Sequence, residues 1–367
     1  MSSIASLGQY SRIMTGKLDA NASSQDGVYP FFTCAKAPLK IDTYSYDCEC
    51  VLVAGNGDLN VKYYNGKFDA YQRTYIVESK DKKTLEVKYL YYFLDDYLET
   101  LRELSIGGVI KYIKLENLTK AQIPLPSLSI QQKIAEVLDR ANDIIEKRKA
   151  QIEKLDLLIK SQFIEMFGDP VTNPKGWKKN CFSVTCNIIT GNTPPRAISE
   201  FYGDYIEWIK TDNISEIDSS LTRANEMLSE KGFKKGRHVD KGCILMTCIA
   251  GSLSSIGNVA ITDRKVSFNQ QINALVPKDY NVFFLYVMLR ILKKEVHKSV
   301  NMMLKGILSK GSLSQIEAVV PPIALQSQFA SFFNQVESQK TLLKKSLELL
   351  EKNYKSLMQK CFNGEVF

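Results

Sequence analysis

One stretch of the sequence occurs twice, and a constant offset of 195 residues relates positions 126–167 to positions 321–362. Loops tolerate insertions and deletions, whereas a long helix does not. A repeat without gaps therefore indicates two copies of one rigid element. Each copy begins at a proline, a residue that suits the first turn of a helix. The matched pairs are Pro126 and Pro321, Gln131 and Gln326, Ala135 and Ala330, Ser161 and Ser356, and Phe167 and Phe362.

Both copies have the hydrophobic spacing of a coiled-coil helix. Apolar residues recur in alternating steps of four and three, which places them along one seam. Where one seam is polar, at Arg148, Gln162 or Lys340, the corresponding residue of the other copy is apolar. We therefore predict two long helices that pack on each other. The predicted seams are Ile134, Leu138, Ala141, Ile145, Arg148, Ile152, Leu155, Ile159, Gln162 and Met166, and Phe329, Phe333, Val336, Lys340, Leu343, Leu347, Leu350, Tyr354, Leu357 and Cys361.

The segments before the two helices also match, but more loosely. In each, short apolar runs separated by Gly, Asn and Asp turns lead to an apolar helix, predicted over 89–104 and over 282–300. Short strands with late helices indicate mixed domains, so the predicted fold class is α+β, with two mixed α/β domains alternating with two long helices. The predicted segments are a domain over 1–125, a helix over 126–169, a domain over 170–320 and a helix over 321–367.

Composition places the chain among folded proteins, because 44% hydrophobic and 24% charged residues are ordinary globular values. No apolar stretch is long enough to cross a membrane, and the first residues lack the basic and apolar parts of a secretory signal. We expect a cytoplasmic location and no membrane partner. The eight cysteines form no C-x2-C pair, and His238 and His297 are the only histidines. We therefore expect buried or free thiols and no metal site.

The positive charge of the chain is concentrated in one segment. Residues 1–125 hold 15 Lys and Arg against 15 Asp and Glu, whereas residues 170–320 hold 20 against 13. The formal net charge of +8 therefore comes mainly from the second predicted domain. Such an asymmetry is expected where one domain meets a polyanion, and it also fits an ordinary basic surface.

The sequence contains no catalytic motif that we recognise. It has no phosphate-binding loop of the G-x-x-x-x-G-K-[ST] type, no N-P-P-[FY] or D-P-P-Y methyltransferase tetrad and no nuclease signature. The segment Thr193-Pro194-Pro195-Arg196 resembles a methyltransferase tetrad but lacks the Asn or Asp that accepts from the target amine, which favours a rigid recognition loop. Gly55-Asn56-Gly57 is either a turn after a strand or a loop that faces DNA.

These features together resemble the DNA-specificity subunit of a Type I restriction–modification system. The resemblance runs the whole length of the chain and rests on the duplicated arrangement of domain and helix. It also rests on three local motifs: T-G-x-T-P-P-R at 190–196, Tyr205–Ile209, and N-Q-Q at 269–271. The resemblance implies two target-recognition domains and two antiparallel spacer helices, related by a pseudo-twofold axis.

The resemblance also implies a function without catalysis. Each domain would read one half of a bipartite DNA target, and the helices would set the half-site spacing. Because the two domains differ in sequence, the half-sites are expected to differ. The implied partners are double-stranded DNA, two modification (methyltransferase) subunits that bind S-adenosylmethionine, and restriction subunits in the full complex. The chain itself is expected to bind no cofactor.

Candidate DNA contacts follow from the chemistry of readout. Arg and Lys suit guanine, Asn and Gln suit adenine, and phosphates accept from Lys, Ser and Thr. Gln72, Gln270 and the basic run from Lys231 to Arg237 could instead cap backbone or form a solvated face. Trp208 lies in an apolar run and is expected in the core. The candidates are Lys17, Asn56, Lys62, Tyr71, Gln72 and Arg73 in the first domain, and Arg196, Lys210, Lys231, Lys234, Lys235, Arg237, Ser252, Ser254, Gln270 and Gln271 in the second.

Two other functions remain open from the sequence. The chain could be a scaffold whose domains bind protein, in which case it would show no salt-dependent duplex binding even with partners present. It could also be an enzyme in its own right, which would require methyl transfer or DNA cleavage by the isolated chain. No constellation of residues in the sequence favours the enzyme.

Overall fold

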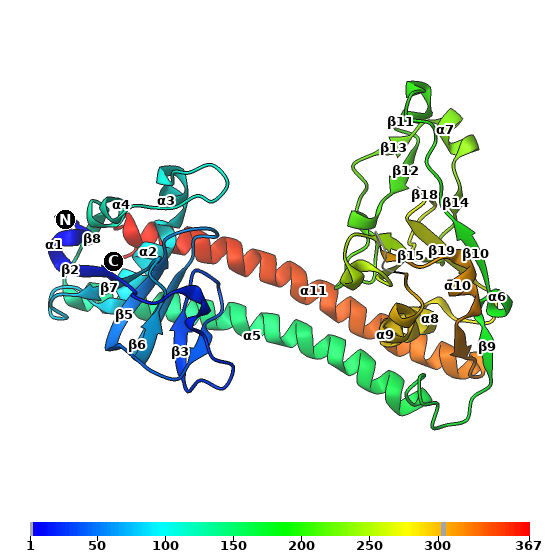
Figure 1. Ribbon diagram of the computed structural model, residues 1–367, viewed down its shortest axis with the longest axis horizontal. Coiled ribbons are helices and arrows are strands. Elements are labelled where there is room, and N and C mark those ends of the chain that lie inside the picture. Colours follow the sequence, from blue (N-terminus) through cyan, green and yellow to red (C-terminus); the bar gives the residue numbers. More distant parts are fainter. Residues whose placement is uncertain (1–2, 302–305) are drawn as a thin grey trace. The chain divides into compact units, whose positions relative to one another are not determined.

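A computed structural model of the chain describes residues 3–301 and 306–367 (Figure 1). It consists of two compact units, which are unit 1 (Met1–Ala150 and Lys344–Phe367) and unit 2 (Gln151–Leu343). Each unit combines a mixed α/β domain with part of helix α5 (Leu128–Phe167) and part of helix α11 (Ile323–Phe362). The predicted alternation of mixed domains and long helices is therefore confirmed.

Unit 1 is built on a six-stranded sheet in the order β2-β7-β5-β6-β3-β4. Neighbouring strands are antiparallel except β3 and β6, which are parallel. Successive side chains of a strand point to opposite faces. Val51 and Val53 therefore pack toward the helices, whereas Leu52 belongs to a second apolar cluster with Phe32 and Phe68. The strands are β2 (Ser11–Thr15), β3 (Tyr29–Phe32), β4 (Leu39–Ile41), β5 (Tyr46–Ala54), β6 (Val61–Ala70) and β7 (Thr74–Ser79).

Short elements complete unit 1 around this sheet. Strand β1 (Ser3–Ser6) pairs with β8 (Gln122–Leu125), next to helix α1 (Leu7–Tyr10). Helix α2 (Val87–Asp96) packs on β5 and β6 (Figure 1). Its buried residues join the start of α5 and the end of α11 in one core. The remaining helices are the 3₁₀ turn η1 (Ala20–Ala22), α3 (Leu98–Leu104) and α4 (Leu115–Thr119).

Unit 2 has two main sheets instead of one. A four-stranded sheet has the order β10-β19-β15-β17, and a five-stranded sheet has the order β11-β13-β12-β18-β14. Two further pairs join β9 to β21 and β16 to β20. The strands are β9 (Lys179–Cys181), β10 (Cys186–Thr190), β11 (Tyr202–Gly203), β12 (Ile206–Ile209), β13 (Met227–Leu228), β14 (His238–Val239), β15 (Ile244–Thr247), β16 (Ile249–Ala250), β17 (Val259–Ile261), β18 (Val266–Phe268), β19 (Ile272–Pro277), β20 (Gly306–Ile307) and β21 (Glu317–Val319).

The helices of unit 2 pack in different parts of the domain, with α8 on the four-stranded sheet and α7 beside β13 of the five-stranded sheet. Helix α8 packs on β15 and β17, and its buried face joins α5 and α11 in the largest apolar cluster of this unit. The helical elements are α6 (Phe182–Thr185), α7 (Glu230–Lys235), α8 (Val282–Ile291), α9 (Lys293–Lys298) and α10 (Lys310–Gln315), with 3₁₀ turns η2 (Ser199–Phe201), η3 (Thr211–Asn213) and η4 (Leu253–Ser255).

The internal repeat extends further in the structure than in the sequence. Helices α5 and α11 begin and end at positions 195 residues apart, and α2 and α8 do the same. The starts of α3 and α9, of α4 and α10, and of β8 and β21 are separated by the same offset. The predicted helices over 89–104 and 282–300 are each two helices, which meet at Tyr97 in unit 1 and at Leu292 in unit 2.

The two long helices pack along the predicted seam. Every predicted seam residue is buried or half-buried. In unit 2, Phe163 contacts Phe329 while Asp156 pairs with Lys340, so the helices run antiparallel there. The seam prediction missed Phe163, which is fully buried because the domain core reaches over the edge of the seam.

Two buried glutamines connect each domain to a long helix in the same way. In unit 1 the Gln131 amide donates to the carbonyls of Thr84 (2.9 Å) and Pro126 (3.0 Å) and accepts from the Glu86 N–H (3.0 Å). In unit 2 Gln326 makes the corresponding bonds to Asp279, Pro321 and Asn281. The glutamine and its three partners in unit 1 each have their counterpart 195 residues later in unit 2. The two units therefore share these three hydrogen bonds residue by residue.

Candidate nucleic-acid interface

The first candidate recognition element is a tight turn between β6 and β7, which we call turn 1 (Tyr71–Thr74). The Thr74 N–H donates to the Tyr71 carbonyl at 2.8 Å and closes the turn. Gln72 and Arg73 lie at its tip, and both side chains are exposed. The tip is fixed from both sides, because the Gln72 N–H donates to the Leu18 carbonyl (2.9 Å) and the Arg73 carbonyl accepts from Gly55 (2.8 Å).

Unit 2 contains the same turn between β18 and β19, which we call turn 2 (Asn269–Ile272). The Ile272 N–H donates to the Asn269 carbonyl at 3.2 Å, and the Gln271 carbonyl accepts from the Cys248 N–H at 2.8 Å. Gln270 is exposed at the tip, and Gln271 is partly buried. The structure therefore places Gln72 and Gln270 at corresponding positions of the two units.

A glycine beside each turn explains why Thr-Gly occurs in both domains. A Cβ on Gly16 would lie 2.1 Å from the Ala70 carbonyl oxygen, and a Cβ on Gly191 would lie 2.1 Å from the Asn269 carbonyl oxygen. No side chain fits such a gap, so glycine is required for the end of the neighbouring strand to approach the turn. This approach brings the segments after β2 and β10 next to the tips.

Around turn 1, the other candidate DNA contacts of unit 1 differ in how exposed they are and in the hydrogen bonds that they already make. Lys17 is exposed beside Gly16, and the Gln72 amide donates to the Asp19 carboxylate at 2.7 Å. Tyr71 is half-buried beneath the tip. Asn56 lies on the loop after β5, where its backbone bridges to Tyr112.

Lys62 of unit 1 is half-buried. Its ammonium donates to the Asn60 side chain, and burial lowers its pKa. Asn60 in turn donates to the Cys34 carbonyl at 2.8 Å. A contact between Lys62 and a phosphate would therefore require the side chain to leave this position.

In unit 2, the segment that follows β10 connects several candidates. The Arg237 guanidinium donates to the Thr190 carbonyl at 2.7 Å. The Asn192 side chain accepts from the Arg237 N–H (2.7 Å) and donates to the Lys235 carbonyl (2.9 Å). The Thr193 hydroxyl donates to the Gln270 side chain. Residues 190–193 therefore bring the basic turn after α7 and the tip of turn 2 to one surface.

Arg196 and Lys210 share one carboxylate. The Arg196 guanidinium binds both oxygens of Glu226 at 2.9 Å, and Lys210 reaches the same carboxylate at 2.5 Å. The hydrogen bond from Arg196, together with Lys210, lowers the pKa of Glu226 to about 2. The guanidinium also lies over the rings of Tyr202 (4.7 Å) and Trp208 (4.9 Å). For either cation to contact DNA, the pairing with Glu226 has to open.

Trp208 is 3% exposed, so the prediction that it belongs to the core is confirmed. Its indole N–H donates to the Asn192 carbonyl at 3.2 Å, and the Tyr202 hydroxyl donates to the Pro194 carbonyl at 2.6 Å. Both bonds fix the loop that carries Arg196. Sequence reasoning missed Asn192 and Thr193 as positioning residues, although the recurring Thr-Gly immediately before them marked the place.

The remaining candidates of unit 2 lie on α7 and on the loop after β16. Lys231 pairs with Glu200 at 2.6 Å and Lys234 pairs with Glu230 at 3.1 Å, both on the surface. The Ser252 hydroxyl is 2.9 Å from that of Ser254. Ser254 also lines a groove of about 780 Å³ beside α9. The Ile249 N–H donates to the Gln271 carbonyl at 3.1 Å, so the loop after β16 begins beside turn 2.

All eight cysteines are free, and residues 3–301 and 306–367 contain no group of three His, Cys, Asp or Glu that could hold a metal ion. Within the same part of the chain, no helix is long and apolar enough to cross a membrane.

Comparison with known proteins identifies relatives of the whole arrangement. The family model described as "Type I restriction modification DNA specificity domain" matches residues 1–154 and 174–352. The EcoDI specificity subunit of Escherichia coli is 42% identical over 154 residues, which are 42% of this chain and 34% of that protein. The MjaIX specificity subunit of Methanocaldococcus jannaschii is 25% identical over 304 residues, which cover 76% of this chain and 69% of that protein.

Two solved structures have the same fold. The S subunit of a Type I restriction–modification system from M. genitalium aligns with a TM-score of 0.60 at 17% identity and covers 99% of this chain and 96% of that chain. A chain from a study of complex assembly and conformational transition of the Type I system aligns with a TM-score of 0.58 at 16% identity, over 99% and 98% of the two chains. The matches to the EcoDI and HindI specificity subunits span only 34% and 42% of those proteins.

Proposed function

The chain belongs to the Type I restriction–modification DNA-specificity family, and on that premise we propose that each of its two domains reads one half of a bipartite duplex DNA target. The observation that carries the proposal is the equivalence of turns 1 and 2. Both turns are closed by a hydrogen bond from their fourth residue to the carbonyl of their first, and they present exposed Gln72 and Gln270 at corresponding positions. A glutamine can form two hydrogen bonds to the major-groove edge of adenine.

The two half-sites are proposed to differ, because the two tips differ beside their shared glutamine. Turn 1 presents Arg73 next to Gln72, and arginine is the usual partner of guanine. Turn 2 has Gln271 at that position. Because the two turns share a backbone conformation but carry Arg73 and Gln271 at the same position, the proposed target is asymmetric.

The long helices are proposed to set the distance between the half-sites. A helix of 40 residues, as in α5 and α11, is about 60 Å long at 1.5 Å per residue. Two antiparallel helices that pack along one seam resist bending better than a single helix, so they can serve as a spacer. The spacing of half-sites then follows the geometry of the protein, as in dimeric repressors.

Catalysis is proposed to come from partners. Two modification subunits that bind S-adenosylmethionine would dock on this chain and methylate adenine, and restriction subunits would join the full complex in the cytoplasm. The chain itself would bind no cofactor and supply specificity. Its basic second domain would provide most of the sequence-independent attraction to DNA, because that attraction scales with the number of phosphates neutralised.

The decisive experiment is methylation mapping. DNA from cells that express this chain with its modification subunit is compared with DNA from cells that express the modification subunit alone. A split, asymmetric motif that appears only with this chain supports the proposal and gives both half-sites. If the complex assembles but no new methylation appears, the chain is not a specificity determinant, and the scaffold becomes the better explanation.

A further inference from the structure

The two glutamines at the tips of turns 1 and 2 are held by opposite ends of their side-chain amides. The Gln72 amino group donates to the Asp19 carboxylate at 2.7 Å, whereas the Gln270 carbonyl oxygen accepts from the Thr193 hydroxyl. Within residues 3–301 and 306–367, the other atom of each amide has no hydrogen-bond partner. Because both side chains are exposed, the atom that is free to bind DNA is the carbonyl oxygen of Gln72 and the amino group of Gln270.

Both partners lie on the segment that follows the glycine beside each turn. Asp19 is three residues after Gly16, and Thr193 is two residues after Gly191. The close approach that each glycine permits therefore brings a carboxylate to the tip in unit 1 and a hydroxyl to the tip in unit 2. The two units share the backbone arrangement but differ in the chemistry of the partner.

Asp19 is positioned by the backbone around it. The Leu18 N–H donates to the Ala70 carbonyl at 3.4 Å, and the Leu18 carbonyl accepts from the Gln72 N–H at 2.9 Å. The Asp19 carbonyl accepts from the Ala22 N–H at 3.1 Å, but the Asp19 carboxylate does not cap the turn η1 that follows. An ionised carboxylate only accepts hydrogen bonds, so it can bind the glutamine only through the amino group.

Thr193 is held between two fixed neighbours. The Asn192 N–H before it donates to the Phe268 carbonyl at 3.1 Å, and the Pro194 carbonyl after it accepts from the Tyr202 hydroxyl at 2.6 Å. The hydroxyl of Thr193 therefore meets the tip of turn 2 from a well-defined backbone. Because it donates to the carbonyl oxygen of the tip glutamine, the amino group of that glutamine keeps both of its hydrogens.

The free atom determines which base edge each glutamine can bind. In the major groove, adenine and cytosine present an amino group where guanine and thymine present a carbonyl oxygen. A free carbonyl oxygen accepts from the former, and a free amino group donates to the latter. The two-bond contact between glutamine and adenine needs both atoms of the amide, one of which is held here. Turning the amide over would therefore exchange adenine for guanine, or cytosine for thymine.

We propose that Asp19 and Thr193 are positioning residues that fix the two tip glutamines in opposite senses. Gln72 then reads an adenine or a cytosine through its carbonyl oxygen. Gln270 reads a guanine or a thymine through its amino group. This inference rests on the proposed function, and it adds that the half-sites differ even at the position of their shared glutamine.

The test is methylation mapping of the assembled complex with variants of each pair. Gln72→Ala and Gln270→Ala first identify the position that each glutamine reads, because that position loses its base preference. Asp19→Ala and Thr193→Val are then expected to relax the same positions within one base class, so that A and G, or C and T, are both accepted. The preference between these two bases is expected to fall by about tenfold, as for the loss of a specific base contact.

Glutamate substitutions test the sense in which each amide is held, because a carboxylate offers only acceptors. In the double variant Asp19→Asn with Gln72→Glu, the new amide donates to the new carboxylate, which still presents an oxygen. Its motif is expected to stay unchanged, at the same net charge. Gln270→Glu presents an oxygen in place of the amino group, so the base at its position is expected to change from G to A or from T to C.

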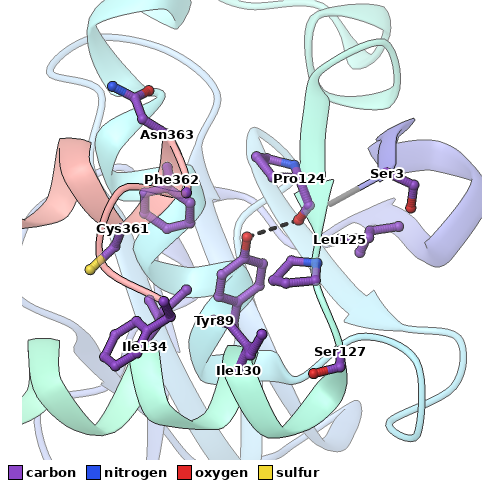
Figure 2. A pocket seen from close by; sticks show the side chains of 13 residues that line it. Ser3, Tyr89, Pro124, Leu125, Ser127, Ile130, Ile134, Cys361, Phe362 and Asn363 are labelled. Atoms are coloured by element: carbon purple, nitrogen blue, oxygen red, sulfur yellow. Dashed lines mark hydrogen bonds between the residues drawn. The ribbon is translucent and has the colours of Figure 1, made fainter. Parts of the chain in front are cut away.

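Two matched controls carry the same chemical changes elsewhere in each unit. Glu365→Ala removes a carboxylate that accepts from the Asn363 side chain at 3.1 Å, and Figure 2 shows Asn363 just after the end of α11. Thr341→Val removes an exposed hydroxyl of α11 that donates to the Glu337 carbonyl at 2.9 Å. Neither control is expected to alter the methylated motif.

Three results would overturn the proposal. The first is an unchanged base preference in the Asp19→Ala and Thr193→Val complexes. The second is loss of the motif in the double variant of unit 1, with the complex shown to assemble. The third is retention of the wild-type base by Gln270→Glu. Each of these leaves a split motif that depends on the chain, so it contradicts this inference alone, whereas the absence of any such motif would contradict the proposed function as well.

Discussion

At the scale of single residues, the structure separates candidate contacts that are free from those that are already bound. Arg73 and Lys17 are exposed, and no ion pair involving either forms within the described part of the chain. Arg196 and Lys210, in contrast, are held by Glu226. Free side chains can bind DNA without rearrangement, whereas these two must first exchange a partner.

Arg73→Ala and Gln270→Ala are each expected to impair recognition of only one half-site, because each lies at the tip of a different turn. Loss of a bidentate base contact weakens discrimination by about 1–3 kcal/mol. Methylation mapping of the two variant complexes measures the effect. The matched controls are Arg140→Ala and Gln328→Ala, exposed residues of α5 and α11. Unaltered specificity in both tip variants would remove these positions from the readout.

Glu226→Gln is expected to reduce the loss of stability of the chain in acid. The pKa of Glu226 is lowered from 4.5 to about 2 in the folded state, so the charged pair stabilises unit 2 above pH 4.5. This contribution disappears as the pH falls from 4.5 toward 2. Thermal unfolding between pH 6 and pH 2.5 should therefore be less pH-dependent in the variant. The control is Glu230→Gln, which removes the exposed ion pair between Glu230 and Lys234 on α7. Identical pH profiles for wild type and Glu226→Gln would contradict the lowered pKa of Glu226.

At the scale of elements, the junction between domain and long helix is the most regular part of the molecule. Gln131 and Gln326 are both fully buried and each makes three hydrogen bonds to backbone groups. The same glutamine connects the start of a long helix to the N-cap of α2 or α8. The two junctions can therefore be compared directly by mutation.

Gln131→Ala and Gln326→Ala are each expected to destabilise the chain by about 1–3 kcal/mol, because buried backbone groups lose their partners. Denaturant unfolding of the full chain measures the effect. Gln132→Ala and Gln328→Ala alter exposed neighbours on the same helices and are expected to change stability by less than about 0.5 kcal/mol. Equal effects of the buried and exposed substitutions would show that the glutamine junction contributes nothing specific.

At the scale of the whole molecule, charge is distributed unequally between two domains of common design. Residues 170–320 contain 20 Lys and Arg against 13 Asp and Glu, whereas residues 1–125 are balanced. The structure adds that Lys235 and Arg237 are exposed at the end of α7, on the same surface as turn 2. Under the proposed function, sequence-independent capture of DNA would therefore fall mainly to unit 2.

The triple variant Lys234→Ala, Lys235→Ala, Arg237→Ala is expected to lower the slope of log affinity against log salt concentration by up to about 3, because each lost phosphate contact removes about 0.9. Binding of the assembled complex to a nonspecific duplex at several salt concentrations measures this slope. The triple variant Lys111→Ala, Lys114→Ala, Lys120→Ala removes the same charge from unit 1. If both variants lowered the slope equally, capture would not be specific to unit 2.

The sequence alone predicted the architecture because its evidence is local or periodic. The gapless offset of 195 residues identified two long helices, and the alternation of steps of four and three identified their buried seam. The structure then places Tyr71–Arg73 and Asn269–Gln271 in equivalent turns. A repeated pattern needs no knowledge of the partners of a residue, so it can be read directly from the chain.

Only the tertiary structure determined which candidate side chains are available. In the sequence, Arg196 and Lys210 look like two independent basic candidates. In the structure, Glu226 binds both of them, although it lies 30 residues from Arg196 along the chain. Thr193 binds Gln270 across 77 residues. Such pairings depend on the order of strands and helices in space, and no local pattern of residues encodes that order.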